Sequence, residues 1–176
     1  GGVSHQETGS TGDGFNWLRS LGHSIVAPTP TIVPLKTKES WSHKISGTSL
    51  ENIKINFYTQ IGDKFVKKLS KKSKKGEKLL FTHFGLSGPF ILNTAGLVAD
   101  MLYEGPVLAK IDIFPDLDIV ALEKNILNIF EKNKNKMLKN ILSEFLPVGM
   151  QDGFLELHKN YSQINFETKV HSITKD

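Results

Sequence analysis

The sequence contains no cysteine. That absence excludes disulfide bonds, zinc sites with thiolate ligands, iron–sulfur clusters held by cysteine and a cysteine nucleophile. Arginine is almost as scarce, since Arg19 is the single example. A broad nucleic-acid-binding face is usually rich in arginine, so its scarcity argues against one. A chain without cysteine fits a reducing compartment, and we expect a cytoplasmic protein.

Long apolar runs are also absent, and none approaches the roughly 20 residues that span a bilayer. Residues 1–14 have neither the basic nor the apolar region of a secretory signal. We therefore expect no membrane partner and no secretion. The 176 residues, 39% of them hydrophobic and 11 of them Phe, suffice for one compact domain with a small appendage.

The net charge of +4 comes from one segment. Between Asp63 and Lys78 there are eight lysines against two acidic residues: Lys64, Lys67, Lys68, Lys71, Lys72, Lys74, Lys75 and Lys78. We interpret this run as a solvated loop, because Phe65 is its only aromatic residue and nucleic-acid-binding grooves interleave aromatic rings with cations. The alternative is a stand-alone module that uses the Lys64 to Lys78 loop to bind phosphate groups or nucleic acid; we consider a nucleic-acid partner the less favoured interpretation.

Hydrophobic periodicity predicts an α+β fold, with a strand-rich first half and a helical second half. Residues 24–35 carry three prolines and predict an edge strand or an extended crossover. Strands are expected over residues 53–58, 64–66, 78–82 and 107–113, the first two joined by a hairpin turn at Gly62 and Asp63. Helices are expected over residues 15–21, 90–103, 120–130, 137–146 and 150–158. The third expected helix has Asp118 as its N-cap, and the second follows Ser87, Gly88 and Pro89.

The first 14 residues, GGVSHQETGSTGDG, form a glycine-rich loop ahead of a predicted helix. Such a loop can aim several backbone N–H groups at one anion, and a helix N-terminus favours negative charge, so phosphate or pyrophosphate is the natural ligand. Asp13 would more readily cap the helix or accept from a ribose hydroxyl. The structural alternative is a flexible terminus followed by an ordinary capped helix.

A second unusual stretch, FTHFGLSGP at residues 81–89, joins a predicted strand to a predicted helix. His83 could donate a proton or bind a ring, while Gly85 and Gly88 could let the backbone approach a flat ligand. The structural alternative is a histidine satisfied within the fold. The other histidines lack metal-ligand spacing, so no metal site is expected.

These stretches, together with LGHSIVAPTPTIVPL at residues 21–35, IDIFPDLDIVALE at 111–123 and LKNILSEFLP at 138–147, resemble the aminoacetone-oxidase-like family of NAD(P)/FAD-dependent oxidoreductases. Members of that family are about twice this length or more. They join an FAD-binding Rossmann-like domain to an inserted middle domain with a β-barrel-like and a helical portion. The present chain resembles the middle region, because it lacks the G-x-G-x-x-G motif that follows a strand.

The resemblance implies a domain that covers FAD and shapes the substrate site of a larger cytoplasmic oxidoreductase. Its partners would be the FAD-binding domain of the same parent chain and a small-molecule substrate, with NAD(P)H as an electron donor. Alone, this chain would bind no FAD and be redox inactive. The implied division is a junction over residues 1–24, a barrel-like portion over 25–115 and a helical portion over 116–176.

The resemblance also implies two sets of site residues, and no catalytic acid or base. The cofactor-facing set is Gly1, Gly2, Ser4, Thr8, Gly9, Ser10, Thr11, Gly12, Asp13 and Gly14. The substrate-cleft set is Thr82, His83, Phe84, Gly85, Ser87 and Gly88. The chain departs from the family at His5 and Gln6, where Tyr and Pro are common, and at residues 148–150, where a basic residue is usual.

Overall fold

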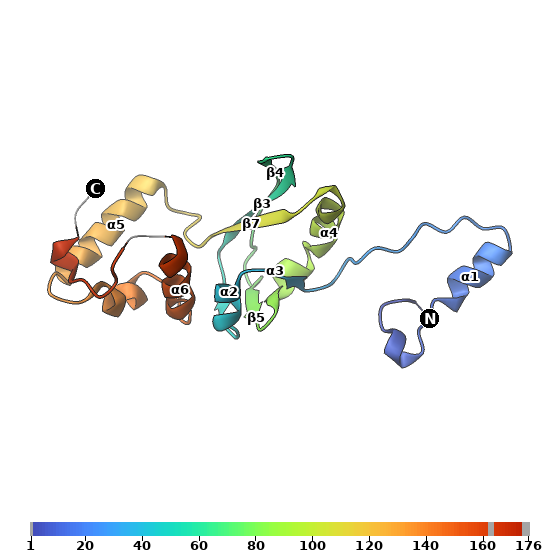
Figure 1. Cartoon of the computed structure of the whole chain (residues 1–176), viewed down its shortest axis with the longest axis horizontal. Helices are drawn as coiled ribbons and strands as arrows, with labels where there is room; N and C mark the ends of the chain where they lie inside the picture. Colours follow the sequence, from blue (N-terminus) through green and yellow to red (C-terminus); the bar gives the residue numbers. More distant parts are fainter. Residues whose placement is uncertain (1, 162–163, 174–176) are drawn as a thin grey trace.

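The computed structural model describes residues 2–161 and 164–173. Figure 1 shows an elongated arrangement in which an N-terminal arm leads into a central sheet region, and a group of helices follows on the opposite side. Two antiparallel sheets and several helices make up the described chain, which confirms the predicted α+β fold.

The first sheet has three strands in the order β4-β3-β7, with β3 at its centre. The strands are β3 (Lys54–Ile61), β4 (Lys64–Lys72) and β7 (Val107–Asp112), all antiparallel. Along β3, buried residues alternate with half-buried ones, as expected of a strand with one face in the core. The predicted hairpin between β3 and β4 is confirmed, and the pairing register shifts by one residue of β4 between Phe57 and Tyr58.

The second sheet has four short strands in the order β1-β6-β5-β2. They are β1 (Leu35–Lys36), β2 (Ser49–Leu50), β5 (Leu79–Thr82) and β6 (Gly85–Ser87). Helix α2 (Ser40–Lys44) lies between β1 and β2 in the chain. Neither α2 nor the two shortest strands was predicted from periodicity.

Helices α3 (Pro89–Leu92) and α4 (Ala95–Glu104) replace the single helix expected over residues 90–103. The break falls at Asn93 and Thr94, where the Thr94 hydroxyl donates to the Phe90 carbonyl (2.8 Å). Such bonding back to residue i−4 bends helices. Phe90 and the buried face of α4 then pack with Phe57 and Phe81 in the main core.

The last third of the chain is helical: α5 (Ile119–Lys132), η2 (Leu138–Glu144), α6 (Gln151–Tyr161) and η3 (Val170–Ser172). The N-cap prediction is confirmed, because the Asp118 carboxylate accepts from the Ala121 N–H (2.7 Å). A small second core forms around Ile141 and Val170. No helix within the described residues is both long and apolar enough to cross a membrane.

The N-terminal arm consists of η1 (Gln6–Thr8), α1 (Asp13–Ser20), a turn at residues 21–22 and an extended segment over residues 23–34. The extended-crossover prediction is confirmed for that segment, which enters a strand only at Leu35. In Figure 1 the arm leads away from the sheets, and α1 stands at the far end of the molecule.

Three further predictions of local structure were wrong. The lysine run is mostly strand, since β4 continues to Lys72 through its pairing with β3. Residues 137–146 form a 3₁₀ helix over Leu138–Glu144 rather than an α-helix. Ser87 does not cap α3: it lies in β6, and Gly88 is the N-cap residue, with no side-chain cap among the described residues.

Thr59 and Thr94 give a matched test of buried hydroxyls. Both are almost fully buried, but only Thr94 has a partner; the Thr59 hydroxyl has none within the described residues. An unpaired buried hydroxyl is destabilising, so Thr59→Val should raise the free energy of unfolding by about 1 kcal/mol. Thr94→Val should lower it by about 1 kcal/mol. Urea denaturation measures both; equal effects of the same sign would contradict this account.

Candidate functional site

The candidate substrate-cleft residues form a hairpin rather than the strand-to-helix junction expected from sequence. β5 and β6 pair antiparallel, with His83 and Phe84 in the turn between them. The Thr82 hydroxyl closes the turn: it donates to the Gly85 carbonyl and accepts from the Gly85 N–H, both at 3.1 Å. The exposed His83 ring meets the Phe84 ring edge-on, 4.9 Å between centroids. The turn therefore presents an imidazole from a fixed backbone.

Close packing against neighbouring backbone explains why glycine occupies positions 85 and 88. A Cβ on Gly85 would lie 2.1 Å from the Leu35 carbonyl oxygen, because β1 pairs closely with β6 at this point. A Cβ on Gly88 would lie 2.6 Å from the Lys78 carbonyl oxygen, and its φ of 87° also favours glycine. At both positions the chain's own backbone occupies the space that a flat ligand would need.

A polar network that sequence reasoning missed adjoins the hairpin. The Thr37 N–H donates to the Phe84 carbonyl (3.1 Å), which ties this network to the turn. The Ser42 hydroxyl donates its one proton to the Glu39 carbonyl (2.7 Å), so it must accept from the Thr37 hydroxyl (2.7 Å). Since the Thr37 proton is then committed, His43 Nε2 must donate to Thr37 Oγ1 (3.0 Å). The network fixes the proton of His43 on Nε2.

The sequence signal for this network is weak. The segment KTKESWSH at residues 36–43 is rich in hydroxyl side chains just before the apolar Trp41, a pattern typical of a helix start. It does not show that two hydroxyls and an imidazole would form one chain of hydrogen bonds beside a hairpin some 40 residues further on, because sheet pairing creates that proximity.

The described members of the cofactor-facing set lie in a mostly exposed loop and the first turn of α1, at the other end of the arm and apart from the hairpin (Figure 1). Gly1 lies outside the described residues. The Thr8 hydroxyl donates to the His5 carbonyl and the Thr11 hydroxyl to the Asp13 carboxylate, both at 2.7 Å. Gly12 is the N-cap of α1 with φ of 78°, and no described side chain caps the helix. The first-turn N–H groups of α1 are thus left without a side-chain acceptor.

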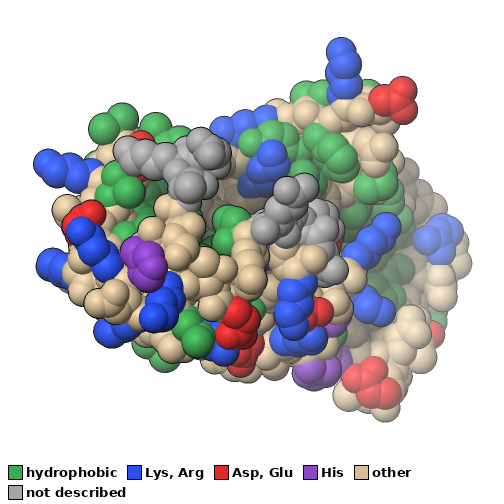
Figure 2. Space-filling view, turned by 60° about the vertical axis from the view of Figure 1, so that its left-hand side comes forward, with side chains coloured by type: hydrophobic (Ala, Val, Ile, Leu, Met, Phe, Trp, Pro, Cys, Tyr) green, Lys and Arg blue, Asp and Glu red, His purple; other side chains and the backbone are tan. Residues whose placement is uncertain are grey.

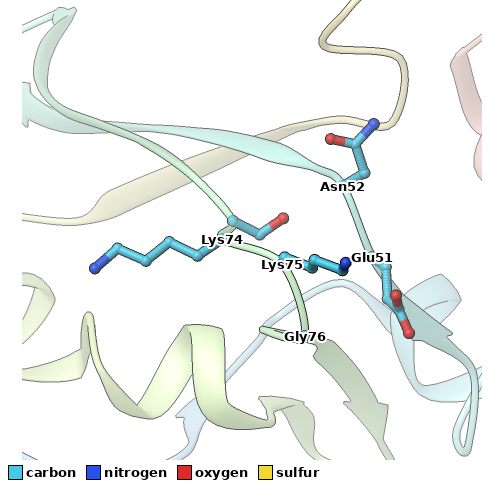
Figure 3. Close-up of a pocket in the computed structure, with 6 residues that line it drawn as sticks. Glu51, Asn52, Lys74, Lys75 and Gly76 are labelled. Atoms are coloured by element: carbon cyan, nitrogen blue, oxygen red, sulfur yellow. The ribbon is translucent and has the colours of Figure 1, made fainter.

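A shallow hollow of about 280 Å³ is lined by no residue of the two predicted site sets, although Lys74 and Lys75 of the lysine run line it. Figure 3 shows its lining residues. Lys74 and Lys75 point to opposite sides of the turn that forms one wall, and Lys75 lies on the side of Glu51 and Asn52. Asn52 adopts a left-handed conformation with φ of 49°. A second hollow of about 450 Å³ lies where the extended segment of the arm passes α4.

Asp116 lies just before the helical region, and its side chain connects this part of the chain to the first sheet. Its carboxylate accepts from Lys72 on β4 and from Asn52 Nδ2 (2.7 Å), 64 residues away in sequence. These hydrogen bonds, the one from Lys72 first, hold the pKa of Asp116 below its ordinary value of 3.8. This carboxylate is exposed and has a structural role that sequence spacing did not indicate.

Across the part of the chain that the structure describes, no three His, Asp or Glu residues gather as a ligand set. His158 instead packs against Phe154 and Phe166, at ring-centroid distances of 4.3 and 5.5 Å. Burial lowers the pKa of His158, which favours a neutral ring within this aromatic cluster.

The fold defines an α+β domain with small antiparallel sheets followed by helices, and comparison with known families agrees. Residues 29–175 match the family described as the HI0933-like protein barrel and H2TH domain. Because the match covers most of the chain, the chain belongs to this family.

Two curated relatives are similar to the chain. A ribosomal RNA dihydrouridine synthase of Haemophilus influenzae is 25% identical over 158 residues, which are 89% of this chain and 34% of the relative. A 3-dehydro-bile acid delta(4,6)-reductase of Clostridium scindens is 24% identical over 158 residues, 89% of this chain and 36% of the relative. The chain spans about a third of the length of both.

Gly85→Ala tests the packing reason for the hairpin glycine. The added Cβ would collide with the Leu35 carbonyl, so the variant should lose about 3 kcal/mol of unfolding free energy as β1 and β6 separate. Gly14→Ala is the control: nothing lies within 4 Å of its Cβ, and alanine in α1 is neutral or stabilising. Denaturant unfolding of both reports the difference; an unaffected Gly85→Ala protein would show that β1 does not lie against β6.

Asp116→Asn tests the contact between the first sheet and the helical region. A carboxylate whose pKa is depressed on folding stabilises the protein above its ordinary pKa, and that contribution is lost as pH falls through the lowered value. The melting temperature of Asp116→Asn should therefore fall below that of the parent sequence at neutral pH. The two should begin to converge as the pH falls below the ordinary pKa of 3.8, and should meet only below the lowered pKa of the folded state.

Lys72→Gln should reproduce the same pH-dependent loss, since it removes the group that lowers this pKa most. The double variant should lose little more than either single variant, because both changes break one contact. A difference between parent and Asp116→Asn that is constant across pH would contradict the assignment.

Proposed function

We propose that this chain is the insert domain of an FAD-dependent oxidoreductase of the HI0933-like family, in which it covers the flavin and shapes the substrate site. In this proposal residues 1–24 form the junction with the FAD-binding domain, residues 25–115 the barrel-like portion and residues 116–176 the helical portion. The chain would be redox inactive by itself. Whether the parent is aminoacetone-oxidase-like stays a prediction.

The relatives support a reductive parent. One relative is named for making dihydrouridine in ribosomal RNA, and the other is named as a reductase of a 3-dehydro-bile acid. Both names describe adding hydrogen to a substrate. Each relative is about three times as long as the region it shares with this chain, which leaves room for a separate cofactor domain.

The observation that carries the proposal is the apolar surface of the N-terminal arm. Trp17 is 69% exposed, Leu21 76% and Val26 91%. Exposed apolar residues clustered on one projecting segment mark a surface that another protein surface covers. A domain of the same parent chain is the partner that the family match favours.

The glycine-rich loop fits one wall of a cofactor site. The N–H groups of the first turn of α1 have no described side-chain cap, and a helix N-terminus suits a pyrophosphate. Ser10 and the glycine backbone would contact the same group, whereas Asp13 would accept from a ribose hydroxyl. The Thr11 hydroxyl is already bonded to Asp13, so the loop orders its own acidic side chain.

When bound, FAD supplies the hydride chemistry, with NAD(P)H as the electron donor. This chain would contribute positioning. The β5–β6 turn holds the His83 ring at the surface, and the Thr37 network holds the proton of His43 on Nε2. In the proposal His83 faces the substrate cleft, and Thr82, Phe84 and Gly85 set its position.

The direct test is to follow the native polypeptide in extracts of the source cells with an antibody raised against this chain. We expect a polypeptide well above 19.6 kDa that co-purifies with flavin absorption in the visible range. The isolated chain should bind no stoichiometric FAD. A colourless native polypeptide of 19.6 kDa would contradict the proposal.

Paired variants in the flavin-containing polypeptide test the arm. Trp17→Ser with Leu21→Ser should weaken the contact with the cofactor domain and lower flavin retention on gel filtration, because buried apolar area is lost. Val148→Ser is the control, since Val148 is as exposed as Val26 but lies outside the arm. Equal flavin loss from the control would mean that the arm has no specific role.

A further inference from the structure

The three-stranded sheet has a polar outer face. Successive side chains of a strand point to opposite sides, and directly paired residues share a side, so the register assigns each residue to a face. The inner face carries the buried Ile55, Phe57 and Thr59 of β3. The outer face comprises Lys54, Asn56, Tyr58 and Gln60 of β3, Phe65, Lys67, Ser70 and Lys72 of β4, and Leu108, Lys110 and Asp112 of β7.

Within the described residues, the helix packed on this sheet lies on the inner side. Val98 and Met101 of α4 share the main core with Ile55 and Phe57. Figure 1 shows α3 and α4 on one side of the β3, β4 and β7 ribbon, with the other side uncovered. The outer face is therefore available to a partner.

The cations of the outer face are largely unpaired. Lys72 bonds to Asp116, but among the described residues no acidic side chain lies within ion-pair distance of Lys54, Lys67 or Lys110. The carboxylate of Asp112, opposite Lys54, accepts from the Phe114 N–H (2.9 Å). The face thus carries an excess of positive charge.

The helical end differs in charge pattern. Several lysines there pair with nearby carboxylates, as in the Lys134–Glu131 and Lys139–Glu167 contacts, both at 2.7 Å. Figure 2, in which the helical side comes forward, shows basic and acidic side chains interspersed. The outer face therefore differs from the helical region in that three unpaired lysines share one face of a sheet, whereas the helical region mixes paired and unpaired lysines.

Aromatic rings interleave with these lysines. Tyr58 lies at the centre of the face, with Lys110 Nζ 5.1 Å from its ring centroid. Phe65 is 48% exposed and, two positions along β4 from Lys67, lies diagonally beside Tyr58. Along the sequence the lysine run includes one aromatic residue, but sheet pairing adds the second. Cations around stacking platforms are the usual surface for single-stranded nucleic acid.

We propose that the outer face of the β4-β3-β7 sheet binds a single-stranded region of RNA, with Lys54, Lys67 and Lys110 on phosphates and bases stacked on Tyr58 and Phe65. This inference rests on the proposed function, because it assigns RNA as the substrate class of the parent oxidoreductase. A bile acid is a poor match for this face: a small, mostly apolar molecule needs a concave apolar site. The flat array of separate cations suits a polyanion.

The test is a fluorescence-anisotropy titration of the 176-residue chain with a labelled single-stranded RNA of about 20 nucleotides, a length that exceeds typical site sizes. The triple variant Lys54→Gln, Lys67→Gln, Lys110→Gln should lose at least about tenfold in affinity and flatten the log–log salt slope by about 2. Tyr58→Leu with Phe65→Leu should lose at least about fivefold with the salt slope unchanged.

The matched control is Lys124→Gln, Lys132→Gln, Lys169→Gln, which removes the same charge from exposed lysines of the helical region. It should change affinity by less than about twofold if the contact is local, and circular dichroism should show every variant folded. Equal losses from both triple variants would mean that net charge alone attracts RNA, and would overturn the proposal. So would absence of RNA binding, or preferential binding to phosphatidylglycerol vesicles.

The RNA-binding proposal and the insert-domain proposal can fail independently, because different measurements test them. RNA binding is read on the isolated chain without flavin, whereas the parent oxidoreductase is tested by size and flavin absorption. Flavin in a longer native polypeptide together with no RNA binding would leave the insert-domain proposal standing and remove only the RNA assignment.

Discussion

The alternation of side chains along β3 is the constraint on which both sheet faces depend. Ile55, Phe57 and Thr59 point to one side and are completely buried, while Lys54, Asn56 and Tyr58 point to the other. A shift of register by one residue would exchange the two sets, placing lysine in the core and phenylalanine in water. The burial of Ile55 and Phe57 against α4 therefore fixes the strand register, and with it the composition of the outer face.

Most of the fold could be predicted from sequence where the local pattern and the tertiary environment agree. The β3–β4 hairpin, β7 and the Asp118 cap are of this kind, because alternation, turn residues and a capping carboxylate all act locally. The lysine run was misassigned for the opposite reason. Lysine has a low strand propensity, yet five lysines of the run lie in β4, which extends to Lys72 because β3 supplies a hydrogen-bonded partner.

The candidate site was less predictable, because its contacts join residues far apart in the chain. The sequence drew attention to Gly85 and Gly88, but not to the Leu35 and Lys78 carbonyls that explain them. Nor did it indicate that Thr37 would lie against the His83 and Phe84 turn. Two glycines in a loop suggest close approach without specifying what approaches, and here the chain's own backbone does.

The apolar N-terminal arm and the basic outer face of the β4-β3-β7 sheet suit binding partners of different kinds. Trp17 and Leu21 gain free energy only when water is excluded, so they suit a lasting contact with a complementary apolar surface. The lysines gain by releasing counterions and remain hydrated, which suits a contact that forms and breaks with salt. If the arm joins domains of one chain, that contact is intramolecular, so its effective concentration is high and a small apolar area suffices. The outer face has no such advantage, and its affinity must come from several separate cations and rings acting together.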